Sequence, residues 1–342
     1  MRKIILLQLL LICCSGKNTF SQCCGGGSAF SGNIADPGSQ SVLHEKQFTV
    51  GTYYHYMYSD QLKTNDFKTI DTLSAGSNFK EYIENYLYTR IAYGISDKLT
   101  IITTIGYFLN KIERQIYGTE VTGQGIGDLV IFPRYNLLNV KNEKHVTDIT
   151  IGLGMKIPTG AYKQTYVAYI NPIDQKVFEQ VKSPSTQPGT GSNDLLLNIF
   201  FARSYSKSQL SFATSFTYIL AGTNPLGYNF GNIANLSIFA STPITYNLNL
   251  TAQLKAASTD TLRDLYGIYK NNTGFKKLFF VPQVSYTLFD KLTIVTTGEL
   301  PLYQFVNGTQ LTSKLFLTGG IIYKFSVKRN RLLKMPESKT DG

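Results

Sequence analysis

The sequence contains no tryptophan and few charged residues, which occupy 16% of its 342 positions. The low charge excludes a long charged coiled coil, and the 23 Tyr and 21 Phe residues argue against disorder. No apolar run reaches the ~18–20 residues that a transmembrane helix requires. Many aromatic residues without a long apolar run are typical of strands that alternate apolar and polar faces, as in outer-membrane barrels.

Histidine is also scarce, and the positions of the three histidines argue against catalysis. His44 precedes the first predicted strand, His145 lies in a predicted turn, and only His55 points inward. A lipid-hydrolysing barrel needs a Ser–His pair on its lipid side, and the sequence offers none. The glycine-rich segment 123–127 leads into a strand rather than a helix, so it predicts no nucleotide site. We therefore expect neither an enzyme nor a cofactor.

The first residues have the layout of a secretory signal peptide. A basic start at Arg2 and Lys3 is followed by an apolar run over 4–14 and a polar exit that ends at Ser21. This pattern predicts a signal peptide over residues 1–21, and a buried N-terminal strand or helix is the less favoured reading.

Two adjacent cysteines, Cys23 and Cys24, begin a Gly- and Ser-rich segment over 22–45. Their thiolates are suited to a soft metal ion such as Cu(I) or Zn(II), but two sulfurs do not make a closed site. An idle terminus or an inter-chain disulfide is the alternative. A segment of ~23 residues extends beyond 30 Å, so it is long enough to plug a barrel; a periplasmic tether is the other reading.

Residues 46–326 alternate between apolar and polar side chains, which predicts about twelve strands of roughly 9–15 residues. The sequence thus predicts an all-β fold, a membrane-spanning antiparallel up-and-down β-barrel, followed by a basic periplasmic tail over 327–342. The predicted strands are 46–58, 80–95, 98–112, 126–139, 146–158, 192–204, 208–221, 231–245, 247–258, 276–289, 291–305 and 312–326.

The predicted connections alternate between short and long. Residues 96–97 and 205–207 form short turns, whereas 159–191 forms a long loop. This alternation is typical of bacterial barrels with tight periplasmic turns and long extracellular loops, so we expect the outer membrane of a Gram-negative cell. The expected partners are outer-membrane lipid, the outer-membrane assembly machinery and a small-molecule solute. No stretch interleaves clustered Lys or Arg with aromatic residues, which argues against nucleic acid.

Charged residues within the predicted strands occupy the face opposite the apolar one. Because an Arg or Lys facing lipid costs ~2–4 kcal/mol at mid-membrane, these charges are expected to line the lumen. Two readings stay open: the charges pair to stabilise a narrow, mostly closed barrel, or they set the selectivity of a polar passage. The predicted lumen-lining residues are Glu84, Arg90, Asp128, Arg134, Asp148, Lys156, Asp194, Lys255, Glu299 and Lys324.

Two prolines within predicted strands, Pro133 and Pro282, each remove a ladder hydrogen bond. Each therefore predicts a bulge or kink in the wall. Such a kink is either a local irregularity or the edge of a lateral gap.

Three motifs occur in order along the chain, and together they resemble a known family. They are Gly125-Ile126-Gly127-Asp128-Leu129 followed by Arg134-Tyr135, then Lys156-Ile157-Pro158-Thr159-Gly160, then Gly189-Thr190-Gly191-Ser192-Asn193-Asp194. Over roughly residues 80–326 the sequence resembles the outer-membrane proteins of the MetA-pathway of phenol degradation family. The resemblance implies a barrel similar to hydrocarbon-transporting barrels of the FadL type.

Two functions compete on this sequence. The resemblance implies passive transport of small, hydrophobic or aromatic molecules, and aromatic residues predicted in the lumen support it: Phe108, Phe132, Phe200 and Phe316. The alternative is a non-transport role, as a structural barrel or as a metal-linked envelope component that uses Cys23 and Cys24.

Overall fold

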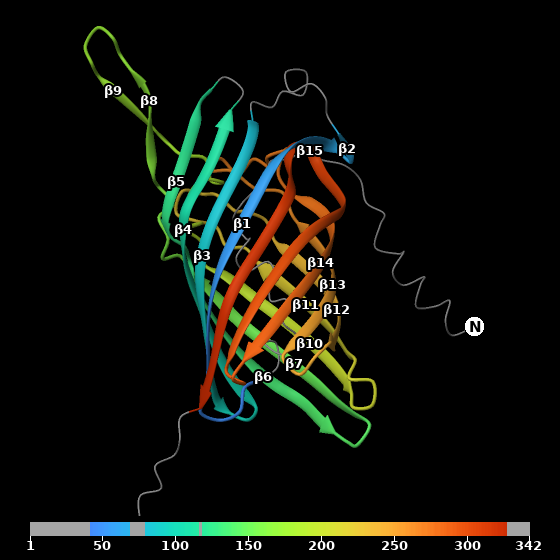
Figure 1. The fold of residues 1–342 in the computed structure, drawn as a ribbon. Helices are drawn as coiled ribbons and strands as arrows, with labels where there is room; N and C mark the ends of the chain where they lie inside the picture. Colours follow the sequence, from blue (N-terminus) through green and yellow to red (C-terminus); the bar gives the residue numbers. More distant parts are fainter. Residues whose placement is uncertain (1–41, 69–78, 116–117, 327–342) are drawn as a thin grey trace, which may run out of the picture.

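The computed structural model describes residues 42–68, 79–115 and 118–326, which form an antiparallel β-barrel (Figure 1). The signal peptide, Cys23 and Cys24, most of the N-terminal segment and the C-terminal tail lie outside these residues. Among the described residues no helix is long and apolar enough to cross a bilayer. The prediction of an all-β antiparallel barrel is confirmed.

Neighbouring strands pair antiparallel in chain order, and the barrel closes where β15 pairs with β1. The strands are β1 Gln47–Asn65, β2 Phe67–Lys68, β3 Phe79–Ser96, β4 Leu99–Gln115, β5 Glu120–Ile126, β6 Leu129–Lys141, β7 His145–Ile157, β8 Thr165–Ile170, β9 Val177–Val181, β10 Asp194–Tyr205, β11 Ser211–Leu220, β12 Ile233–Pro243, β13 Leu248–Thr259, β14 Phe275–Leu288 and β15 Leu292–Ser326.

β15 doubles back on itself. Its 35 residues would extend about 115 Å at about 3.3 Å per residue. Instead, its first limb, through Val306, pairs with β14, and its second limb, from Thr309, pairs with β1. The backbone N–H of Lys324 donates to the carbonyl of Lys291, so the two ends of β15 meet. In the described residues the wall therefore has eleven strands when β15 is counted once and twelve passes when both limbs are counted.

The two ends of the barrel differ in their connections. At the turn end, three to five residues join β6 to β7, β10 to β11 and β14 to β15. At the loop end, residues 158–193 and 221–232 form long connections. The alternation is not strict, however, because the limbs of β15 meet at the loop end in a tight turn at Asn307 and Gly308. Gly308 has φ +58°, and Asn-Gly is the residue pair that such a turn favours.

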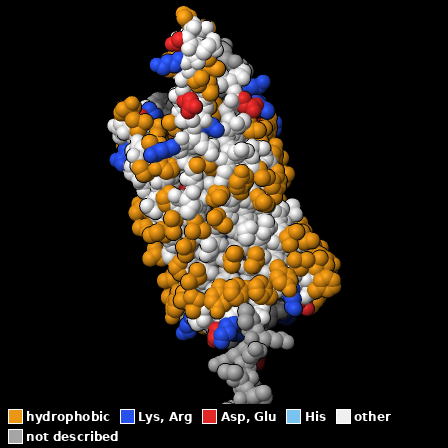
Figure 2. Space-filling view, turned by 90° about the vertical axis from the view of Figure 1, so that its left-hand side faces the viewer, with side chains coloured by type: hydrophobic (Ala, Val, Ile, Leu, Met, Phe, Trp, Pro, Cys, Tyr) orange, Lys and Arg blue, Asp and Glu red, His pale blue; other side chains and the backbone are white. Residues whose placement is uncertain are grey.

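Side chains alternate between the outside and the interior of the wall. On β7, Ile151, Leu153 and Met155 are exposed, whereas the interior-facing Thr150 is fully buried. Figure 2 shows hydrophobic side chains over the wall and Lys, Arg, Asp and Glu side chains gathered towards the two ends. This surface matches a hydrocarbon layer bounded by water at both ends.

Two prolines interrupt the regular pairing of the wall. Pairing between β6 and β7 is interrupted at Pro133, and pairing between β14 and β15 is interrupted at Pro282. The missing N–H groups of the two prolines predict these interruptions. Two further elements were not predicted: β5, which extends the wall beside the outer half of β4, and the hairpin of β8 and β9, which projects beyond the loop end (Figure 1). The sequence analysis treated both as loop.

Candidate functional site

The middle of the barrel interior is lined by aromatic and aliphatic side chains. Phe132 on β6 packs with Ile102 on β4 and Leu196 on β10, and all three are almost completely buried. The rings of Tyr86 and Phe108 lie against each other at a tilt of 30°, with centroids 4.2 Å apart. The middle of the interior is therefore packed with apolar and aromatic side chains.

Buried ion pairs lie beside this aromatic surface. Lys255 Nζ is 2.9 Å from both carboxylate oxygens of Glu299, and both side chains are about 95% buried. Lys111 Nζ lies 3.8 Å from Glu84 Oε2 and donates to the carbonyl of Gln187 at 2.9 Å. Because an isolated buried charge is costly, each pairing offsets part of the cost of burying its two partners.

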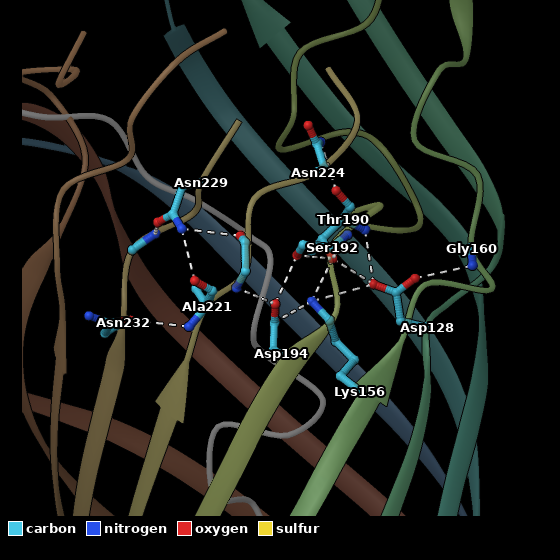
Figure 3. A network of polar contacts seen from close by, with 12 residues as sticks. Asp128, Lys156, Gly160, Thr190, Ser192, Asp194, Ala221, Asn224, Asn229 and Asn232 are labelled. Atoms are coloured by element: carbon cyan, nitrogen blue, oxygen red, sulfur yellow. Dashed lines mark hydrogen bonds and ion pairs between the residues drawn. The ribbon is translucent and has the colours of Figure 1, made fainter. Parts of the chain in front are cut away.

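A polar network ties the long 158–193 connection to the wall at the loop end (Figure 3). Lys156 Nζ lies 2.5 Å from Asp194 Oδ2 and 3.6 Å from Asp128 Oδ2. Asp128 also accepts hydrogen bonds from the backbone N–H groups of Gly160, at 3.1 Å, and Thr190, at 2.9 Å. One lysine and two aspartates thus fix a loop that folds back over the barrel mouth.

This network brings together the three motifs that carry the family resemblance. Asp128 belongs to the first motif, Lys156 and Gly160 to the second, and Thr190 and Asp194 to the third. The second and third motifs also pack closely: a Cβ at position 189 would lie 2.5 Å from the carbonyl carbon of Gly160, so only glycine fits there. The motif residues therefore act together in holding the loop.

The 221–232 connection extends the network through Asn224. Its Nδ2 donates to the carbonyl of Thr190 at 2.9 Å, and its Oδ1 accepts from the N–H groups of Leu226 and Tyr228. The next long connection, 260–274, repeats this turn with Asp264 in the place of Asn224. The two connections lie side by side, joined by a β-bridge between Asn229 and Arg263.

Two titratable groups in these connections have pKa values shifted from their usual range. The ammonium of Lys270, 2.6 Å from Asp264 Oδ2, lowers the pKa of that carboxyl, and the N–H groups of Ile268 and Tyr266 lower it further. Burial raises the pKa of the Tyr228 phenol, and the Asp264 carboxylate adds to this shift. Both groups therefore keep their usual forms, carboxylate and neutral phenol, at neutral pH.

A pocket of about 250 Å³ lies at the loop end, among the inward faces of β4 and β5 and the two connections that follow β7 and β11. Its lining includes Tyr162, Tyr166, Tyr228 and Phe230 as well as the carboxylate of Glu113. Two residues further along the inner face of β4 lies Lys111, which is buried beside Glu84.

The structure places nine of the ten predicted lumen residues on the inner side of the wall. These nine are buried or half-buried: Glu84, Arg90, Asp128, Arg134, Asp148, Lys156, Asp194, Lys255 and Glu299. Lys324 differs because it is exposed at the turn end, near the close of β15. It therefore lies at the rim and not inside the barrel.

The structure brings together only some of these residues. Asp128, Lys156 and Asp194 share one network, and Lys255 pairs with Glu299. The others have separate surroundings: Glu84 meets Lys111, Arg134 lies over the Phe132 ring at 5.2 Å, and Asp148 accepts from Asn136 Nδ2 at 2.6 Å. His55 is buried, and its Nδ1 lies 2.9 Å from Thr318 Oγ1.

Sequence reasoning missed Lys111 and Glu113. The register of β4 against β5 shifts between Phe108 and Lys111, so the inward face passes from even to odd residue numbers. A strict period of two assigns both residues to the outside, and no signal in the sequence marks the shift. In the described residues, no group of three or more His, Cys, Asp or Glu side chains is positioned to hold a metal ion.

Comparison with known proteins shows the fold. No protein-family model and no curated protein matches the sequence. Among solved structures, the COG4313 outer membrane channel from Pseudomonas putida F1 aligns with a TM-score of 0.59 at 14% identity, covering 85% of this chain and 99% of that one. At this identity the likeness establishes a shared barrel fold.

Two further structures align more loosely. A Pseudomonas aeruginosa FadL homologue gives a TM-score of 0.40 at 10% identity, covering 90% of this chain and 98% of that one. The CymD monoaromatic hydrocarbon channel gives 0.38 at 11% identity, covering 87% and 92%. Neither likeness extends beyond the general form of a barrel.

Proposed function

We propose that the protein is an outer-membrane channel for the passive movement of small hydrophobic or aromatic molecules. The observation that carries the proposal is the inner surface of a closed barrel, where aromatic clusters around Phe132 and Tyr86 lie beside paired charges. An apolar outer wall faces lipid, while aromatic rings and paired polar groups line the interior.

The likeness to a known channel supports this function. The P. putida structure with the shared fold is described as an outer membrane channel. The three motifs of the phenol-degradation family meet in one network at the mouth of the barrel, which supports membership of that family. A family whose barrels are similar to FadL-type transporters favours a hydrophobic or aromatic solute.

The proposed orientation places the turn end in the periplasm and the loop end outside the cell. Residues 1–21 direct export and are removed, and the assembly machinery then inserts the barrel into outer-membrane lipid. The basic tail over 327–342 follows the second limb of β15 at the turn end, so it lies in the periplasm.

The N-terminal segment is proposed to enter the barrel from the turn end. Just before β1, the backbone N–H of Leu43 donates to Thr100 Oγ1 at 2.8 Å, and Thr100 faces the interior. The chain at this point therefore lies on the inner side of the wall. A segment entering here would narrow the passage and regulate it, and Cys23 and Cys24 would lie on it.

A non-transport role is the second candidate. The buried pair of Lys255 and Glu299 satisfies both charges within the barrel, as expected for a closed structural barrel. A metal-linked role would add Cu(I) or Zn(II) on Cys23 and Cys24.

Conductance in planar bilayers separates these functions. The mature chain is compared with a variant lacking residues 23–41 and with the double variant C23S/C24S, with and without copper or zinc. We expect conductance from the mature chain and a larger, steadier current from the deletion variant. A barrel that assembles but conducts in neither form would remove the transport proposal, and an effect of metal that needs both cysteines would favour the metal-linked role.

A further inference from the structure

We infer that the loop-end pocket binds a small aromatic molecule that carries a protonated amine, with Glu113 as the group that recognises the ammonium. This inference rests on the proposed function, since it names the class of solute that the pocket would accept first. Its basis is the environment of one carboxylate and of the rings around it.

Glu113 is a buried carboxylate that lines the pocket. Its residue is 5% exposed, and its Oε2 accepts hydrogen bonds from Ser185 Oγ at 2.7 Å and Ser183 Oγ at 3.1 Å. Within the described residues, no Lys, Arg or His side chain forms an ion pair with it. Two uncharged hydroxyl groups orient this carboxyl group, and neither supplies a positive charge.

Two lysines close to the pocket in sequence or in its lining bond to other groups. Lys111, two residues along β4, lies by Glu84 and donates to the carbonyl of Gln187. Lys182 lines the pocket, but its Nζ points to Gln164 Oε1 at 3.5 Å. Because buried charges are normally paired, a ligand cation that meets Glu113 would supply the partner that the protein does not.

The remaining lining suits the ring and the hydroxyl groups of such a ligand. Tyr162, Tyr166 and Tyr228 present aromatic rings, which attract cations and stack on a ligand ring. Gln115 and Gln180 add amide groups that can bond to a hydroxyl. With a volume of about 250 Å³, the pocket is suited to a single-ring molecule rather than a long acyl chain.

Binding of three matched probes to the purified, refolded full-length barrel tests the inference. The probes are tyramine, 4-ethylphenol, which lacks the amine, and 3-(4-hydroxyphenyl)propanoate, which carries a negative charge instead. Titration calorimetry is expected to show tyramine binding about tenfold more tightly than 4-ethylphenol, with the anion weakest. Equal binding of tyramine and 4-ethylphenol would overturn the inference without any variant.

Two variants assign the preference to one side chain. In Glu113→Gln, tyramine and 4-ethylphenol should bind with affinities within about threefold of each other, since the carboxylate charge is gone. Glu179→Gln is the matched control, because Glu179 is an exposed carboxylate on the neighbouring hairpin that bonds to Thr165 Oγ1. Heat-modifiable gel migration shows that each variant is folded. A tyramine preference that persists in folded Glu113→Gln contradicts the assignment.

Flux measurements keep this inference distinct from the transport proposal. A barrel that prefers tyramine in calorimetry but passes no solute into liposomes would support the pocket and refute the channel. A barrel that passes aromatic solutes without any tyramine preference would support the channel and refute the pocket.

Discussion

Replacing Lys156 with methionine should destabilise the barrel by about 3 kcal/mol. The lysine side chain is 12% exposed, and those of Asp128 and Asp194 are 7% and 9% exposed. Removing one partner of a buried ion pair costs about 3–5 kcal/mol, because an uncompensated charge remains. The backbone N–H groups that bond to both aspartates stay in place, so the expected loss lies at the lower end of this range.

A double-mutant cycle with Lys156→Met, Asp194→Asn and the double variant separates the ion pair from lost packing. Adding Asp194→Asn to Lys156→Met removes one of the two stranded carboxylates, and about 1–2 kcal/mol should return. Lys314→Met is the matched control, because Lys314 Nζ lies 2.9 Å from Asp60 but its side chain is 61% exposed. This exposed pair should contribute less than about 1 kcal/mol.

Equilibrium unfolding in urea, followed by circular dichroism on detergent-refolded barrel, gives the free energy of unfolding of the unchanged barrel and of each variant. The reasoning is refuted if Lys156→Met costs no more than Lys314→Met. It is also refuted if Asp194→Asn deepens the loss in the Lys156→Met background, since the carboxylate would then not be the stranded charge.

Three further predictions concern packing, orientation and pH. Gly189→Ala should lower the free energy of unfolding by about 1–3 kcal/mol in the same assay, because the new Cβ would lie 2.5 Å from backbone atoms of Gly160. Gly298→Ala is the control: the atom nearest to its Cβ would lie 3.6 Å away, so the free energy of unfolding should change by less than about 0.5 kcal/mol. Leu153→Arg on the outer wall should reduce insertion into liposomes by ~2–4 kcal/mol, whereas Ile173→Arg on the projecting hairpin should insert normally. The pKa of Asp264 is lower in the folded loop than in the unfolded chain, where it is about 3.9. The stability that Asp264 contributes to the loop is therefore fully present above the unfolded pKa and is lost as the pH falls through the folded pKa. Hydrogen exchange of residues 260–274, corrected for intrinsic rates, should rise below about pH 4, and Asp264→Asn should show that faster exchange already at pH 7.

The wall could be predicted from sequence because a strand in lipid must alternate strictly. Each predicted range overlaps a strand or a limb of β15, and the predicted inward charges Glu84, Lys255 and Glu299 are buried. A charge on the lipid side is expensive, so its parity along the strand is a physical constraint and not only a statistical preference.

The site could be predicted only in part, because its geometry depends on contacts between distant residues. The three motifs contain Asp128, Lys156 and Asp194, but nothing local shows that one lysine lies between both aspartates. Glu113 was missed because a register shift in β4 moves it to the inner face. Loop packing of this kind depends on the assembled barrel, so strand periodicity carries no information about it.

Uptake of a small neutral aromatic solute into liposomes that contain the purified barrel tests the channel most directly. Both sets of liposomes are made from the same dense, slowly permeable lipid. The proposed function predicts that 4-ethylphenol enters liposomes with the barrel faster than it enters protein-free liposomes. It also predicts slower uptake when Phe132 is replaced by aspartate, with assembly confirmed by heat-modifiable migration. Uptake no faster than that of protein-free liposomes, from a barrel that is inserted and folded, would contradict the proposal.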